Sequence, residues 1–175
     1  MREFFAGANF SGRSAALMRR LQQRLSFFVG PYAEGALSGL SSTVADEIAI
    51  YRAPAPAHAE FSGLDVAAFA ARKPPTLSGG EQVLLALHCF SRSDYTAIGI
   101  DTALEQLDPA NRDRALAYLA SGDFSAWLID NRLEAPPGWS AQAYTSDTAF
   151  ACDLAAAVDK LKPSKAPAIA IDTLS

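Results

Sequence analysis

The sequence LSGGEQ, at residues 77–82, decides how the rest of this chain is interpreted. Its residues are Leu77, Ser78, Gly79, Gly80, Glu81 and Gln82, and they follow directly on Thr76. Two adjacent glycines allow a ligand to approach the backbone closely, and a serine before them is a preferred helix cap. The apolar run at residues 83–87 then predicts a helix, whose first-turn N–H groups favour an anion. The stretch therefore predicts an anion-binding helix start.

These six residues resemble the signature motif of ATP-binding-cassette (ABC) ATPases. In that family the signature does not bind the nucleotide of its own subunit. It closes over the γ-phosphate of ATP held by the opposite subunit. The resemblance therefore implies a homodimer, or a heterodimer with another ABC ATPase subunit.

Composition limits the other classes of function. The chain has 175 residues, half of them hydrophobic, which suits one domain with a real core. Its net charge of −4 gives no reason to expect a nucleic-acid partner. No apolar stretch reaches the length of a membrane span, and the N-terminus lacks a signal-peptide pattern. We expect a cytoplasmic protein that lies at the inner membrane only through partners.

A second motif lies at the start of the chain. Residues 2–6 read as a short buried strand, and a glycine loop then leads into a helix expected to run to Leu25. The glycine spacing fits the phosphate-binding loop pattern GxxxxGKS, with arginine in place of lysine. The candidate nucleotide-binding residues are Gly7, Asn9, Ser11, Gly12, Arg13, Ser14 and Ala15. A plain glycine turn between strand and helix is the alternative.

Two of these residues depart from the family pattern. Arg13 keeps the positive charge of the usual lysine, but a guanidinium is planar and bulkier than an ammonium. Ala15 replaces the hydroxyl residue that usually follows the serine. We therefore expect nucleotide binding to be weakened in its phosphate contacts.

The stretch at residues 95–101 is an apolar strand that ends in Asp101, and it resembles Walker B. The resemblance implies that Ser14 and Asp101 hold Mg²⁺, bound together with ATP or another nucleoside triphosphate. Thr102 then falls where the family has its catalytic glutamate. Glu105 lies at the wrong offset to replace it, and Asp108 with the leucine before it matches the D-loop, which also acts across the dimer.

Further positions of the family pattern are altered. The switch histidine falls at Asp130 or Asn131, and the Q-loop glutamine falls at Ala33. The alternation of strands and helices predicts an α/β fold of the P-loop NTPase type, with a three-layer, mainly parallel sheet. We expect one domain over residues 1–175, in which residues 43–92 form a reduced helical and signature region. The family's N-terminal β-subdomain is expected to be missing.

The sequence also predicts elements for the end of the chain, at residues 141–175. A last strand is predicted at residues 141–145, an amphipathic helix at residues 150–161 and a tail at residues 162–175.

The altered positions are those that serve a subunit's own ATP, whereas those that serve a partner's ATP are kept. The leading hypothesis is a degenerate ABC-type ATPase subunit that supplies its signature to a composite site in a dimer. The resemblance to importer cassettes of the cobalt and energy-coupling-factor type implies a membrane transporter subunit as a further partner. Two alternatives stay open: an active small ATPase that hydrolyses ATP slowly, and a nucleotide-independent scaffold. Whether the chain is an enzyme is undecided at this point.

Overall fold

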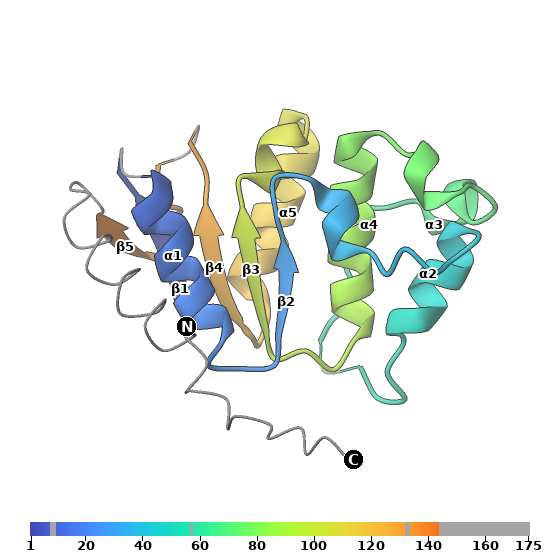
Figure 1. The fold of residues 1–175 in the computed structure, drawn as a ribbon, viewed down its shortest axis with the longest axis horizontal. Helices are drawn as coiled ribbons and strands as arrows, with labels where there is room; N and C mark the ends of the chain where they lie inside the picture. Colours follow the sequence, from blue (N-terminus) through green and yellow to red (C-terminus); the bar gives the residue numbers. More distant parts are fainter. Residues whose placement is uncertain (8–9, 57, 132–133, 144–175) are drawn as a thin grey trace, which may run out of the picture.

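The computed structural model describes residues 1–7, 10–56, 58–131 and 134–143, which form alternating strands and helices around one sheet (Figure 1). The five strands are β1 (Arg2–Ala6), β2 (Ser26–Val29), β3 (Ala97–Asp101), β4 (Ser125–Ile129) and β5 (Ser140–Ala143). They lie in the order β2-β3-β4-β1-β5, and each neighbouring pair is parallel. The predicted α/β class with a mainly parallel sheet is therefore confirmed.

Helices cover both faces of this sheet. Helix α1 (Phe10–Leu21) packs on one face, where its Leu17 joins Phe5 and Trp127 in a small buried cluster. Helices α4 (Gly79–Arg92) and α5 (Pro109–Ser121) contribute to the larger cluster on the other face. Successive strand residues point to opposite faces, so Phe4 and Phe5 belong to different clusters. The molecule thus has the three expected layers.

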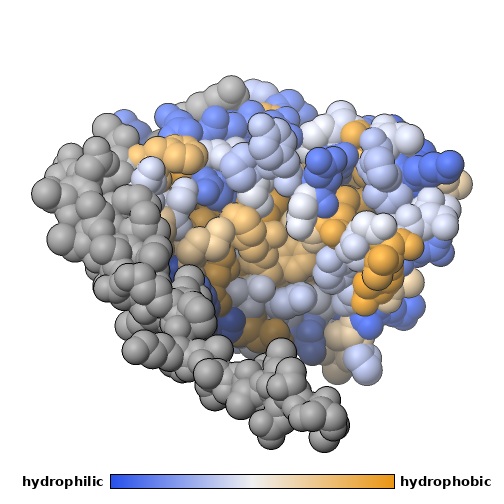
Figure 2. Space-filling view, viewed as in Figure 1, coloured by the Kyte–Doolittle hydropathy of each residue, from blue (hydrophilic) through white to orange (hydrophobic). Residues whose placement is uncertain are grey.

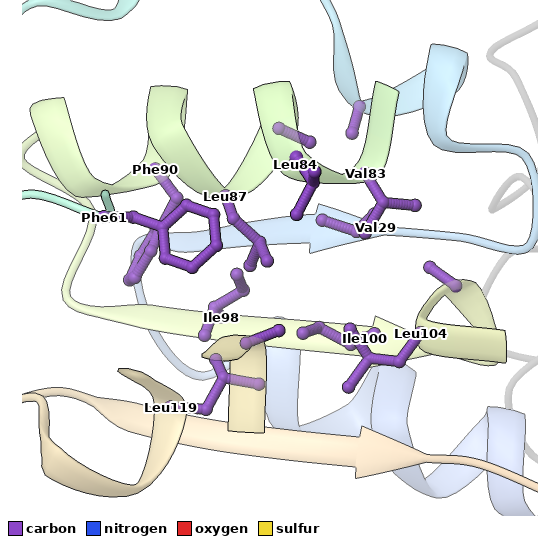
Figure 3. Close-up of a cluster of buried hydrophobic side chains, with 14 of the residues drawn as sticks. Val29, Phe61, Val83, Leu84, Leu87, Phe90, Ile98, Ile100, Leu104 and Leu119 are labelled. Carbon is purple, nitrogen blue, oxygen red and sulfur yellow. The ribbon is translucent and has the colours of Figure 1, made fainter. Parts of the chain in front are cut away.

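The larger cluster ties helix α4 to the sheet. Figure 3 shows side chains of α4 meeting side chains of β2 and β3, with a residue of α5 on the same side. The labelled residues of these elements are Val29, Val83, Leu84, Leu87, Phe90, Ile98, Ile100 and Leu119, all of them buried. Every residue of α4 from 83 to 91 is buried, and the cap at Ser78 marks the start of the helix at Gly79.

The region between β2 and α4 is made of short elements. They are η1 (Ala33–Ala36), α2 (Val44–Tyr51), α3 (Val66–Phe69) and η2 (Pro74–Thr76). Thr43 and Asp46 form a reciprocal capping box that starts α2. Within the apolar stretch at residues 64–71, only Val66–Phe69 is helical.

Two other boundaries differ from expectation. Helix α1 ends at Leu21 rather than Leu25, because the chain tightens there into bonds such as that from the N–H of Arg24 to the carbonyl of Leu21. Leu25 already takes part in the sheet edge, where its carbonyl accepts from the N–H of Thr96 at 3.1 Å. The end of the predicted last strand beyond residue 143, the predicted helix at residues 150–161 and the tail at residues 162–175 lie outside the described residues. In the described part of the chain, none of the helices is both long and apolar enough to cross a bilayer.

Candidate functional site at the carboxyl edge of the sheet

Parallel strands end at one edge of a sheet, and this edge is where α/β proteins bind ligands. Figure 2 shows mostly hydrophilic residues along the edge toward which the strand arrows point in Figure 1. Strand β1 ends beside Gly7, which has a φ of 103° that favours glycine, and helix α1 starts soon after it. Strand β3 ends at Asp101, with β4 lying between β3 and β1. The edge therefore gathers the predicted phosphate loop and the predicted Walker B carboxylate.

Ser14 and Asp101 meet at this edge. The Ser14 hydroxyl donates to Oδ2 of Asp101 at 2.9 Å, across 87 positions of sequence. These two residues were predicted as Mg²⁺ ligands from separate motifs. Their contact means that one cation can reach both oxygens.

The environment of Asp101 fits a cation. The residue is 5% exposed, and its Oδ1 has no hydrogen-bond partner among the described residues. Burial raises the pKa of this carboxyl, against the lowering effect of the Ser14 hydroxyl and of the Arg13 charge. A divalent cation would supply the missing partner of Oδ1 and favour the ionised form. Oxygen ligands from a serine and an aspartate match the preference of Mg²⁺.

Most of the residues predicted for the phosphate loop are helical. Helix α1 begins at Phe10, so the candidate residues Ser11, Gly12, Arg13, Ser14 and Ala15 all lie in its first turns. Asn9 lies outside the described residues. Phosphate contacts from these helical residues would therefore come from the start of α1.

Arg13 is turned toward the end of β4. It is 5% exposed and donates from Nη2 to Oδ1 of Asn131 at 2.7 Å. Its guanidinium also lies 5.3 Å from the centroid of the Phe10 ring, a cation–π contact. The positive charge of the motif is therefore present at the edge, where Asn131 fixes the position of the Arg13 guanidinium.

Thr102, at the position predicted for the catalytic glutamate, follows directly on β3. Its backbone is left-handed, with a φ of 58°, which is unusual for a β-branched residue. Its N–H donates to the carbonyl of Ile129 at 2.8 Å, and its hydroxyl donates to the carbonyl of Asp101 at 2.7 Å. The Thr102 side chain thus faces its own backbone and offers no acid or base.

Asp130 and Asn131 are the two positions predicted for the switch histidine. Asp130 is 2% exposed, whereas Asn131 is exposed and accepts from Arg13. The Q-loop position, Ala33, is buried in η1. None of these three side chains can reproduce the chemistry of the histidine or the glutamine.

The signature and the D-loop line one surface hollow of about 450 Å³. Its lining residues are Ser78, Gly79, Gly80, Glu81, Leu84, Gln106, Leu107, Asp108 and Asn111. Two motifs that lie far apart in the sequence are therefore neighbours, as expected if they act together. Leu77 is buried beneath the hollow, and Gln82 reaches back toward the carbonyls of Pro74 and Leu77.

Reciprocal capping shapes the start of α4. The Ser78 hydroxyl accepts from the N–H of Glu81 at 3.3 Å, and the N–H of Ser78 donates to Oε2 of Glu81 at 2.6 Å. Arg72 pairs with the other oxygen of Glu81 at 3.1 Å. The backbone hydrogen bond from Ser78, first of all, lowers the pKa of Glu81. Glu81 is therefore a charged cap and not a free acid.

Both glycines lie against Gln106, a neighbour that the sequence did not disclose. A Cβ on Gly79 would lie 2.1 Å from Oε1 of Gln106. A Cβ on Gly80 would lie 3.0 Å from the backbone oxygen of Gln106. Gln106 also donates from Nε2 to the carbonyl of Pro31 at 2.6 Å. Sequence reasoning assigned no role to Gln106, because nothing in the spacing placed its segment against the signature.

The hollow carries negative charge. Asp108 caps α5 by accepting from the N–H of Asn111 at 2.9 Å, and this backbone bond is the main cause that lowers the pKa of Asp108. With Glu81, the lining contains two carboxylates and no lysine or arginine. Arg72 beside Glu81 offsets part of this negative charge, and a further cation would favour phosphate binding in the hollow.

Comparisons with known proteins bear on the fold. No protein-family model matches the sequence. No curated protein matches it either. Many solved structures do match, among them the dimeric ATP-binding cassette MJ0796 in a post-hydrolysis state with ADP and Pi, which is 17% identical with a TM-score of 0.53. That match covers 74% of each chain.

Two further structures belong to whole transporters. A bacterial Atm1-family ABC exporter with ATP bound is 19% identical, with a TM-score of 0.56 over 75% of this chain and 30% of its own. An inward-facing structure described as a metal-chelate type ABC transporter is 20% identical, with a TM-score of 0.52 over 73% of this chain and 62% of its own. At these identities the likeness concerns the fold alone. The chain therefore has the fold of ABC ATPase cassettes, with Ser14 and Asp101 at its ligand-binding edge.

Proposed function

We propose that this chain is a degenerate ABC-type ATPase subunit. It binds the phosphates of Mg²⁺–ATP, or of another nucleoside triphosphate, at the start of α1. The observation that carries the proposal is the contact between Ser14 and Asp101, with a buried Asp101 oxygen that lacks a partner. A cation brought by the nucleotide would satisfy that oxygen.

The hollow at the signature supports the second half of the proposal, a composite site in a dimer. Its two carboxylates and lack of basic side chains make it a poor site for phosphate alone. A partner that brings its own Mg²⁺ and basic residue would supply the positive charge. The Ser78 hydroxyl and the first N–H groups of α4 would then face the partner's γ-phosphate. The fold of the transporter cassettes supports a transporter subunit as a further partner.

The test is Ser78→Arg, which fills the hollow. We expect this subunit's own affinity for Mg²⁺–ATP, measured by calorimetry, to stay within about twofold, a change of roughly 0.4 kcal/mol. ATP-driven association should be lost, as measured by sedimentation velocity of the chain alone and with a candidate cassette partner. Thr43→Arg is the matched control, because Thr43 caps α2 with a capping box of the same kind away from the hollow.

If Ser78→Arg changed association no more than Thr43→Arg does, the signature would be a relic. A nucleotide-independent scaffold would then be the better reading. One observation favours that alternative: the predicted phosphate-loop residues 11–15 already lie in helix α1. Failure of the wild-type chain to bind Mg²⁺–ATP or Mg²⁺–ADP would decide for it.

A further inference from the structure

Glu105 reaches the ligand-binding edge although its sequence offset is wrong for the family's catalytic acid. It lies in η3 (Ala103–Gln106), the short turn that follows β3. Its Oε1 accepts from the N–H of Asn131 at 2.9 Å, across 26 positions of sequence. The Glu105 carboxylate therefore links the ends of β3 and β4. Arg13 and the predicted Mg²⁺ ligands Ser14 and Asp101 lie at the same edge.

The surrounding charges place Glu105 in the same site. Glu105 raises the pKa of Asp101, as a nearby like charge does, although burial is the larger cause. Asn131 links the group further, because its backbone donates to Glu105 while its side chain accepts from Arg13. The Arg13 guanidinium and the carboxylates of Asp101 and Glu105 thus lie near one another at this edge.

Other carboxylates at this edge are less suited to act on water. Asp101 is engaged with Ser14 and fits the Mg²⁺ position, and Asp130 is 2% exposed. Asp108 caps α5 in the signature hollow. Glu105 is half-buried, so water can reach its carboxylate.

We propose that Glu105 is the catalytic carboxylate of slow nucleotide hydrolysis, in place of the acid that Thr102 does not supply. This inference rests on the proposed nucleotide site. Glu105 would orient a water molecule toward the γ-phosphorus and accept its proton. The water oxygen bonds to the γ-phosphorus, and the bond from that phosphorus to the bridging oxygen breaks. The bridging electron pair leaves with the nucleoside diphosphate.

The decisive variant is Glu105→Gln. A glutamine keeps an oxygen that can accept from Asn131, so the fold of the edge is preserved, but it cannot accept the proton. We expect kcat to fall by about 10²- to 10⁴-fold, the usual contribution of a positioned base. Nucleotide affinity should stay within about twofold. In single-turnover experiments this variant should accumulate bound, uncleaved ATP, an effect that a merely structural role for Glu105 would not produce.

Two further variants sharpen the test. Glu105→Asp withdraws the carboxylate by one methylene and should give an intermediate rate. Glu34→Gln removes an exposed carboxylate on η1 and should leave the rate unchanged.

The outcomes separate this inference from the proposed function. If the wild-type chain fails to bind Mg²⁺–ATP in calorimetry, the nucleotide site itself is wrong. If it binds but shows no turnover, alone or with a partner cassette, Glu105 is not a catalytic base and nucleotide binding still stands. Wild-type rates in Glu105→Gln would overturn the inference in the same way.

Discussion

Replacing Asp101 with asparagine should stabilise the unliganded protein and abolish its use of Mg²⁺. The Asp101 carboxyl is buried, one oxygen lacks a partner among the described residues, and burial raises its pKa. An asparagine can still accept from Ser14 but carries no charge. The amide still leaves one polar atom without a partner, so any gain comes from removing the desolvated charge; since the attraction of Arg13 is lost with it, we expect a gain of about 1 kcal/mol. For a chain of this size, that gain corresponds to about 2–4 °C in Tm.

The pH dependence of this gain has a definite sign. Because the pKa of Asp101 in the folded state lies above its ordinary value of 3.8, the wild-type protein loses stability as the pH rises through the folded-state pKa. At pH values below 3.8 the carboxyl is protonated in both states. The advantage of Asp101→Asn should therefore appear at neutral pH and disappear in acid.

Urea unfolding at a series of pH values measures this difference. Thermal unfolding with Mg²⁺–ATP should raise the Tm of the wild type but not that of Asp101→Asn, because the variant lacks the charged ligand. Asp113→Asn, on the exposed side of α5, is the control and should change stability by less than about 0.5 kcal/mol. If Asp101→Asn were destabilising by about 1 kcal/mol or more at neutral pH, pairing with Arg13 would outweigh burial and the reasoning would be refuted.

Two further predictions concern the scaffold around the site. Glu47 is fully buried and accepts from the N–H and hydroxyl of Ser38 and from the hydroxyl of Ser41, so Glu47→Leu should cost about 2–3 kcal/mol by leaving these donors without an acceptor. Glu47→Gln should cost less than half as much in urea unfolding, because an amide can still bond these partners; equal costs would show that the hydrogen bonds do not matter. A Cβ on Gly99 of β3 would lie 2.9 Å from Cδ1 of Leu17 and 2.8 Å from Cδ2 of Leu21, so Gly99→Ala should cost about 1–3 kcal/mol by pushing α1 away from the sheet. Gly35→Ala, where a Cβ meets nothing within 4 Å, should be nearly neutral, and a similar loss there would argue against a packing cause.

Local patterns were sufficient to predict the α/β fold class and several of its elements. Apolar patterns predicted strands at residues 2–6 and 95–101, close to the observed β1 and β3, because a buried strand is a short run of apolar residues. The cap at Ser78 was also readable, since a capping box forms within one turn. The meeting of Ser14 with Asp101 followed from the parallel sheet, which brings strand ends to one edge.

The tertiary structure alone decided the contacts between side chains that lie far apart in sequence. Arg13 binds Asn131 across 118 positions, and Gln106 reaches Pro31 across 75 positions while filling the space above Gly79. Glu105 has the wrong offset in a linear alignment, yet the turn of η3 brings it back to the edge. A spacing rule describes distances along the chain. The position of a side chain in space depends on how whole segments pack, so a residue at the wrong offset can still reach the site.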